Sequence, residues 1–249
     1  MIRAIAGREL RSLFLSPLAW AVLAAVQLIL AYEFLIQMEL YFQLQPRLGA
    51  AGGAVGVTDL VVAPLYSNAA VVLLLIVPLM TMRLISEERR SRTMPLLFSA
   101  PVSMTEIVLG KYLGILCFLA LMIVMITLMP LSLLLWGGLD MGKFAACVLG
   151  VVLLSASFAA LGLFMSTLTA QPAVAGVSTF GALLLLWVIN WVGTGGGSGN
   201  ALTYLSLLHH FQPLLEGIFG TRDLVYYALF ILVFVVLAVQ RLDGQRLQH

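Results

Sequence analysis

The residues most able to take part in chemistry gather in one short charged segment at positions 86–93. It contains the acidic pair Glu87 and Glu88, the basic pair Arg89 and Arg90, and the hydroxyl of Thr93. Carboxylate and guanidinium groups at this density form ion pairs with another protein surface. No serine–histidine, cysteine–histidine or metal-ligand constellation accompanies them in the sequence. The segment therefore indicates recognition rather than catalysis.

A short apolar element follows the charged segment and is bracketed by prolines. Leu96, Leu97 and Phe98 lie between Pro95 and Pro101. An apolar element beside a charged segment is a suitable docking surface for a soluble partner. From physical chemistry alone, an ordinary loop whose apolar residues dip into lipid explains the pattern equally well.

Three further polar residues are candidates for a substrate path or gate. Glu33 lies near the end of the first apolar run, and Glu216 lies in the last long connection. Ionisable residues close to lipid are functional candidates by default, although both can also simply reach the headgroup layer. Asn190, close to two tryptophans, is expected either to bond between helices or to line the path.

No catalytic residue, metal site or cofactor site is expected in this chain. His209 and His210 are adjacent, so on a helix their side chains diverge by about 100° and do not easily chelate one ion. Cys117 and Cys147 show no ligand spacing and are expected to be small packing residues. The sequence also lacks a G-x-x-x-x-G-K-[ST] phosphate-binding loop, so any ATP and Mg would be held by a separate protein.

Six long apolar runs must position these residues. The chain has 249 residues, of which 62% are hydrophobic and only 10% are charged, whereas soluble domains carry roughly a quarter charged residues. Backbone polar groups in lipid must be paired within the chain, so each run is predicted to be a helix. We predict an all-α polytopic membrane protein, a single transmembrane domain over 1–249 with spans near 18–36, 69–85, 107–136, 144–168, 173–192 and 224–240.

Shorter elements are expected before and between the spans. Residues 1–14 alternate in a helical period that predicts an amphipathic, interfacial helix. Residues 37–68 are glycine-rich, which indicates a flexible or partly interfacial loop. The outer loop 193–223 begins with a glycine-rich linker at 195–199 and then predicts a short re-entrant or interfacial helix.

Two prolines and one cap refine the predicted helices. Pro78 and Pro130 lie inside apolar runs, where they are expected to kink or locally break the backbone. Ser103 and Glu106 match a capping box, which predicts that the third span begins there.

The basic residues determine the predicted orientation. When connections are assigned alternately to the two sides, ten of the 13 Lys and Arg residues lie on the side of both termini and of segment 86–102. Cytoplasmic loops carry such an excess. We therefore predict a multi-pass protein of the bacterial inner membrane with both termini cytoplasmic. A net charge of only +2 argues against a nucleic-acid partner.

The charged segment also lies within a longer pattern that resembles a known family. In order and spacing, two runs are similar to the ABC-2 transporter permeases of the gliding-motility and nitrous-oxide-reductase-maturation group. The first run comprises Pro78, Met82-Arg83, Glu87-Glu88, Thr93, Leu96-Leu97, Pro101-Val102-Ser103 and Gly110-Lys111. The second comprises Tyr204-Leu205-Ser206-Leu207, His209-His210-Phe211, Gly217 and Arg222-Asp223-Leu224-Val225-Tyr226-Tyr227. The chain has Arg92 where the family usually has Gly and Pro95 where it usually has Glu.

The resemblance implies a permease subunit of an exporter-like ABC transporter that moves an unidentified substrate. Two permease copies would lie side by side in the bilayer, each above one cytoplasmic ABC ATPase that supplies ATP and Mg. An auxiliary membrane or periplasmic subunit is a further candidate partner. Segment 86–102 would be the coupling segment, carried by Glu87, Glu88, Arg89, Arg90, Thr93, Leu96, Leu97, Phe98 and Pro101.

Two other classes of function remain as alternatives. A secondary carrier driven by an ion gradient usually has ionisable residues or broken helices at mid-membrane, whereas the acidic residues of this chain cluster near the ends of its apolar runs. A membrane enzyme would need a catalytic constellation that the sequence does not offer. A neighbouring gene for an ATPase with a P-loop would favour the permease.

Overall fold

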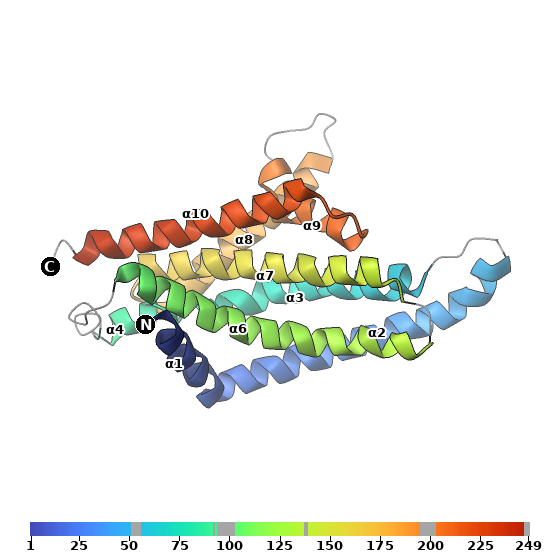
Figure 1. Cartoon of the computed structure of the whole chain (residues 1–249), viewed down its shortest axis with the longest axis horizontal. Helices are drawn as coiled ribbons and strands as arrows, with labels where there is room; N and C mark the ends of the chain where they lie inside the picture. The colour runs from blue at the N-terminus through green and yellow to red at the C-terminus, as the bar shows by residue number, and fades with distance from the viewer. Residues whose placement is uncertain (51–55, 92, 94–102, 137–138, 195–202, 247–249) are drawn as a thin grey trace.

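The computed structural model describes residues 1–50, 56–91, 93, 103–136, 139–194 and 203–246, and its regular elements in these ranges are helices (Figure 1). Six helices are long and apolar enough to cross a membrane, which confirms the predicted all-α polytopic fold. They are α2 (Pro17–Ala50), α3 (Ala63–Thr81), α6 (Met104–Leu131), α7 (Met141–Leu168), α8 (Pro172–Thr194) and α10 (Thr221–Arg246).

Shorter elements precede or join these six helices. The N-terminal helix α1 spans Ile2–Leu15, and α9 spans Leu207–Leu215 between α8 and α10. A π-helical turn at Thr58–Val62 leads into α3, and the five-residue helix α4 (Ser86–Arg90) follows it. Two 3-10 turns lie at Ser132–Trp136 and Thr203–Leu205.

Helix α7 is the centre of the bundle. It packs against α3, α6, α8, α9 and α10. In its most apolar window 72% of the residues are buried inside the structure, compared with 17% for α8 and 11% for α10. Because α8 and α10 direct most of their apolar side chains away from the bundle, their outer faces suit lipid or another membrane subunit.

Small residues allow α7 to approach α3 closely. Ser155, Ser157, Ala159 and Ala160 are buried on α7. At Gly162 a side-chain Cβ would lie 2.1 Å from Oγ1 of Thr81 on α3, which is far inside van der Waals contact. The two helix backbones therefore meet at this glycine, as small residues permit in membrane helices.

Helix α1 packs across the first turns of α6. Gly110 and Gly114 of α6 provide the space, since a Cβ at Gly110 would lie 2.7 Å from Ile5 and one at Gly114 would lie 2.8 Å from Glu9. Trp20 Nε1, just after the α1–α2 corner, donates a 2.8 Å hydrogen bond to the Phe14 carbonyl. The N-terminal helix is thus attached to the bundle along one face.

Local signals in the sequence placed the third span well but not the first long connection. The capping box of Ser103 and Glu106 is present at the start of α6, and α6 ends at Leu131, one residue after Pro130, where a 3-10 turn follows. By contrast, the expected loop 37–68 is largely helical, because α2 continues to Ala50 and helical structure resumes at Thr58. Good helix formers occupy positions 37–45, which favours continuation of α2. The linker 195–199 lies outside the described residues.

Candidate functional site

The charged segment of the sequence begins as α4, which is attached directly to the central helix. Helix α3 ends at Thr81, and a turn separates it from α4. The backbone N–H groups of Ile85 and Ser86 each donate a 3.0 Å hydrogen bond to Oγ of Ser166 on α7. The Ser166 hydroxyl donates in turn to the Met82 carbonyl at 3.2 Å. One fully buried serine therefore satisfies N–H groups that the start of a helix would otherwise leave unpaired.

A buried lysine connects α4 to two further helices. Nζ of Lys111 on α6 lies 2.9 Å from Oε1 of Glu88 on α4 and 3.2 Å from Oε2 of Glu9 on α1. The lysine side chain is 5% exposed, and the carboxylate side chains of Glu9 and Glu88 are 19% and 17% exposed. Ions removed from water to this extent are stable only when they are paired. The Lys111–Glu9–Glu88 triad therefore holds three helices together through charge.

The remaining described residues of the segment divide into inward and outward groups. Arg89 donates a hydrogen bond from its guanidinium to the side-chain oxygen of Gln245 near the end of α10. Thr93 donates two hydrogen bonds to the Glu88 carbonyl, one from its N–H at 3.0 Å and one from its hydroxyl at 3.2 Å. Glu87 and Arg90 are exposed. Four further predicted coupling residues lie outside the described residues, namely Leu96, Leu97, Phe98 and Pro101.

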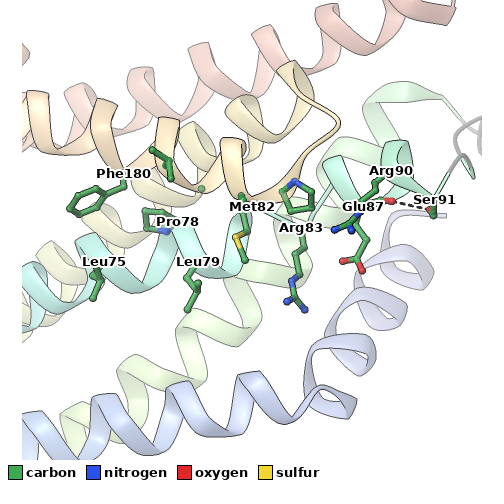
Figure 2. Close-up of a pocket in the computed structure, with 13 residues that line it drawn as sticks. Leu75, Pro78, Leu79, Met82, Arg83, Glu87, Arg90, Ser91 and Phe180 are labelled. Atoms are coloured by element: carbon green, nitrogen blue, oxygen red, sulfur yellow. Dashed lines mark hydrogen bonds between the residues drawn. The ribbon is translucent and has the colours of Figure 1, made fainter.

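A groove of about 880 Å³ runs alongside α4, between α3 and α8. Figure 2 shows Leu75, Pro78 and Phe180 along its apolar part and Arg83 with Arg90 toward its charged end. Glu87 and Ser91 also line the charged end. The opposite wall on α8 contains Pro172, Ala173, Gly176 and Val177. An apolar groove that ends in charged groups suits a molecule with an apolar body and a polar head.

Two of the candidate gate residues, Glu33 and Glu216, do not line this groove. Glu33 on α2 accepts a hydrogen bond from the side-chain amide of Asn68 on α3, so it joins two helices away from α4. Glu216 caps the end of α9 and is exposed. Asn190 lies on α8, but its side chain is outside the described part of the chain. Among the described residues no hydrogen bond or ion pair joins Glu33 to Glu216, and the proposed role of all three residues stays a prediction.

Sequence reasoning missed four residues that support α4. Glu9, Ser166 and Gln245 are ordinary polar residues in the linear sequence, and Lys111 was noted only as part of the Gly110-Lys111 pair of the family resemblance. Two local signals could have singled out Lys111. It lies inside an apolar helix, where ionisable residues mark functional positions, and it is flanked by the G-x-x-x-G pattern of Gly110 and Gly114, which marks close helix packing.

One comparison with known proteins found a match. A family model described as ABC-2 family transporter protein matches residues 56–239. The matched range includes α3, α4, α6, α7 and α8 and most of α10, and therefore the groove, Lys111 and Ser166. Helix α1, with Glu9, precedes it. A search of curated proteins found no match.

Proposed function

This chain belongs to the ABC-2 family of transporter proteins, whose members are the membrane permeases of ABC transporters. We propose that it is the permease subunit of an exporter-like transporter and that a separate cytoplasmic ATPase drives the transport. The ATPase would bind ATP and Mg, and segment 86–102 would dock on it. The observation that carries this proposal is the attachment of α4. Ser86 joins α4 to Ser166 on α7, Glu88 joins it to Lys111 on α6 and through that lysine to Glu9 on α1, and Arg89 joins it to Gln245 on α10.

This attachment gives a physical route for coupling. A force applied at α4 meets buried hydrogen bonds and ion pairs rather than a loose loop, so it moves several helices together. Rigid-body movement of packed helices is a common form of gating. Helix α3 continues directly into the turn before α4 and forms one wall of the groove. Movement of α4 would therefore open or close the groove between α3 and α8.

The groove is the proposed place of substrate entrance. Its apolar walls and its charged end at Arg83, Glu87 and Arg90 match an amphiphile that leaves one membrane leaflet with its polar head still at the surface. The substrate itself is not specified by these features. Glu33, Asn190 and Glu216 remain proposed contributors farther along the path.

The proposed orientation places α4 in the cytoplasm of a bacterial inner-membrane protein. Helices α1 and α4 and the last turns of α10 lie toward the same end of the bundle, which supports a common side for both termini (Figure 1). The excess of basic residues in these parts of the chain supports the cytoplasmic side. The narrower resemblance to the gliding-motility and nitrous-oxide-reductase-maturation permeases stays a prediction that rests on the residue signature.

We further propose that a second permease copy completes the transporter. The outward-facing apolar side chains of α8 and α10 supply surfaces for a membrane partner. An auxiliary membrane or periplasmic subunit is part of the same proposal, and the resemblance is its only support.

The test is recovery of the ATPase from membranes that contain equal amounts of wild-type or Leu97→Asp permease. Burying one leucine side chain stabilises the complex by roughly 1.5–3 kcal/mol. The aspartate would also place an unpaired charge in the apolar docking surface of the ATPase. Binding and stimulation of ATP hydrolysis should both fall sharply, whereas Leu97→Met, the matched control, should retain them. Unchanged binding by the aspartate variant would remove the coupling assignment.

A further inference from the structure

Helix α1 carries its basic and acidic side chains on opposite faces. Its 14 residues include three arginines, Arg3, Arg8 and Arg11, and a single acidic residue, Glu9. Because successive residues of an α-helix are rotated by about 100°, the three arginines lie within an arc of about 140° and Glu9 lies on the opposite side. The arginines are exposed, whereas Glu9 is largely buried and pairs with Lys111.

The packing of α1 determines which of its faces is turned outward. The face with Glu9 lies against α6, where Gly110 and Gly114 leave room for it. The 3.2 Å ion pair with Lys111 holds the same face in place. Around the helix Gly7 lies between the arginines, and a Cβ at this glycine would meet nothing within 4 Å. The helix cannot rotate about its axis without breaking the ion pair, so the arginines stay on the open face.

No acidic side chain neutralises this basic face within the described ranges. The ion pairs found there are formed by Lys111, Lys143 and His210, and none of the three arginines takes part. At the start of α6, Glu106 is engaged in the capping box with Ser103. The residues outside those ranges include no aspartate or glutamate. The positive charge of the face is therefore available to an anionic partner.

Exposed apolar side chains at the end of α1 place this face beside lipid. Leu15 is 76% exposed, and Trp20, just after the α1–α2 corner, is 59% exposed. The Trp20 indole bonds to the Phe14 carbonyl and so lies against the last turn of α1. Tryptophan is typical of the membrane–water interface, and α1 lies beside the first turns of the spanning helix α6 (Figure 1). The arginines are thus at the level of the lipid headgroups, where long basic side chains reach the phosphates.

We propose that the basic face of Arg3, Arg8 and Arg11 binds the headgroups of anionic phospholipids on this side of the membrane. Guanidinium groups donate paired hydrogen bonds to phosphate oxygens. A headgroup with a net negative charge is attracted to all three arginines, whereas a zwitterionic headgroup also presents a cation that they repel. Since Glu9 on the other face joins α1 to Lys111, the same short helix connects the lipid-binding face to the triad that holds α4.

The test places a fluorophore between the arginines of the full-length chain. In a background with Cys117→Ala and Cys147→Ala, Gly7→Cys carries a bimane in vesicles that mix phosphatidylcholine and phosphatidylglycerol. A small, equal fraction of either lipid is then replaced by its analogue with a spin label near the top of one acyl chain, which quenches the bimane on contact. The phosphatidylglycerol analogue should be enriched at the fluorophore by roughly fivefold, the effect of one basic side chain near the membrane surface.

Gly181→Cys on α8 is the matched control, because its Cβ position is equally open. Both analogues should quench the bimane at this position alike. Equal quenching by the two analogues at Gly7→Cys would overturn the proposal. Absence of quenching by either analogue would place the basic face in water, which would overturn the proposal as well and favour a soluble partner.

Charge removal gives an independent measurement. The combined change Arg3→Gln, Arg8→Gln and Arg11→Gln should abolish the preference at Gly7→Cys, whereas Arg222→Gln, which removes an exposed arginine at the start of α10, should retain it. A preference that survives the combined change would overturn the assignment. If that variant does not insert, the arginines are kept and the salt is raised to about 1 M, where the Debye length is about 3 Å. The preference should then weaken, and an unchanged preference would contradict binding through charge.

Discussion

Nζ of Lys111 lies 2.9 Å from the carboxylate of Glu88, and this ion pair joins the first turns of a membrane-spanning helix to the short helix that begins the charged segment. Glu9 completes the triad from the N-terminal helix. Glu88 is the link between them and the proposed docking segment, because Thr93 also bonds back to its carbonyl. The position of α4 thus depends on a charge buried in α6.

Replacing Lys111 with Met should leave two carboxylates close together without a cation. The expected loss of stability is about 3 kcal/mol, at the low end for removal of one partner from a buried ion pair, because Glu9 and Glu88 keep 19% and 17% exposure. The measurement is the thermal unfolding midpoint in detergent. Adding Glu9→Gln and Glu88→Gln to Lys111→Met should restore much of that midpoint without restoring ATPase stimulation. A triple variant as unstable as Lys111→Met alone would contradict the triad.

Ser166→Ala should detach the start of α4 from α7. Two buried N–H groups lose their acceptor, at about 1–3 kcal/mol for each unsatisfied group. The matched control is Ser157→Ala, since Ser157 is equally buried on α7 but donates only to the Leu153 carbonyl of its own helix. The unfolding midpoint should fall for the first variant and change little for the second. Equal effects would show that Ser166 only fills space.

The six spans could be predicted from the sequence because their cause is local. Lipid offers no hydrogen-bond partners, so every long apolar run must be helical whatever its neighbours are. The capping box at Ser103 is local in the same way, since it joins residues three positions apart. Such features need no knowledge of the tertiary fold.

The support of α4 could not be predicted because its pairs are remote in the chain. Lys111 lies 102 positions from Glu9, and Arg89 lies 156 positions from Gln245. Which polar residues meet depends on how the helices cross, and the crossings depend on contacts such as that between Gly162 and Thr81. The extension of α2 was missed for a different reason. The glycines at 49–56 indicated a loop, so the good helix formers before them were assigned to that loop and not to α2.

Gly162→Ala should disturb the crossing of α3 and α7. The new methyl group would lie 2.1 Å from Oγ1 of Thr81, so one helix must shift, and overpacking of this kind costs about 1–3 kcal/mol. Gly181→Ala on α8 is the control, because nothing lies within 4 Å of its Cβ position. That change should be neutral or slightly stabilising, since alanine favours helix. Thermal unfolding of both variants checks the difference, and a neutral Gly162→Ala would refute the close crossing.

The proposed orientation predicts opposite labelling of two introduced cysteines. In a background with Cys117→Ala and Cys147→Ala, Arg90→Cys should react with a membrane-impermeant maleimide only from the cytoplasmic side. Gly196→Cys should react only from the other side. Labelling of intact cells and of inverted vesicles measures both. Reaction of the two positions from one side would refute the six-span topology.

The proposed movement of the groove can be followed at Val177, which lines it from α8 and is 73% exposed. In the cysteine-free background, Val177→Cys should react with a small apolar maleimide at a rate that depends on the state of the ATPase, because movement of α4 and α3 would widen or narrow the groove. The comparison is between the nucleotide-free complex and one trapped with ATP and vanadate. Val174→Cys is the matched control, since Val174 is also on α8 and 50% exposed but does not line the groove. Its rate should be the same in both states.

The single change Lys111→Met, combined with Val177→Cys, should abolish the dependence on nucleotide if the triad transmits the movement. Equal rates for Val177→Cys in both states, in a complex that still hydrolyses ATP, would mean that the groove is not the moving part of the permease.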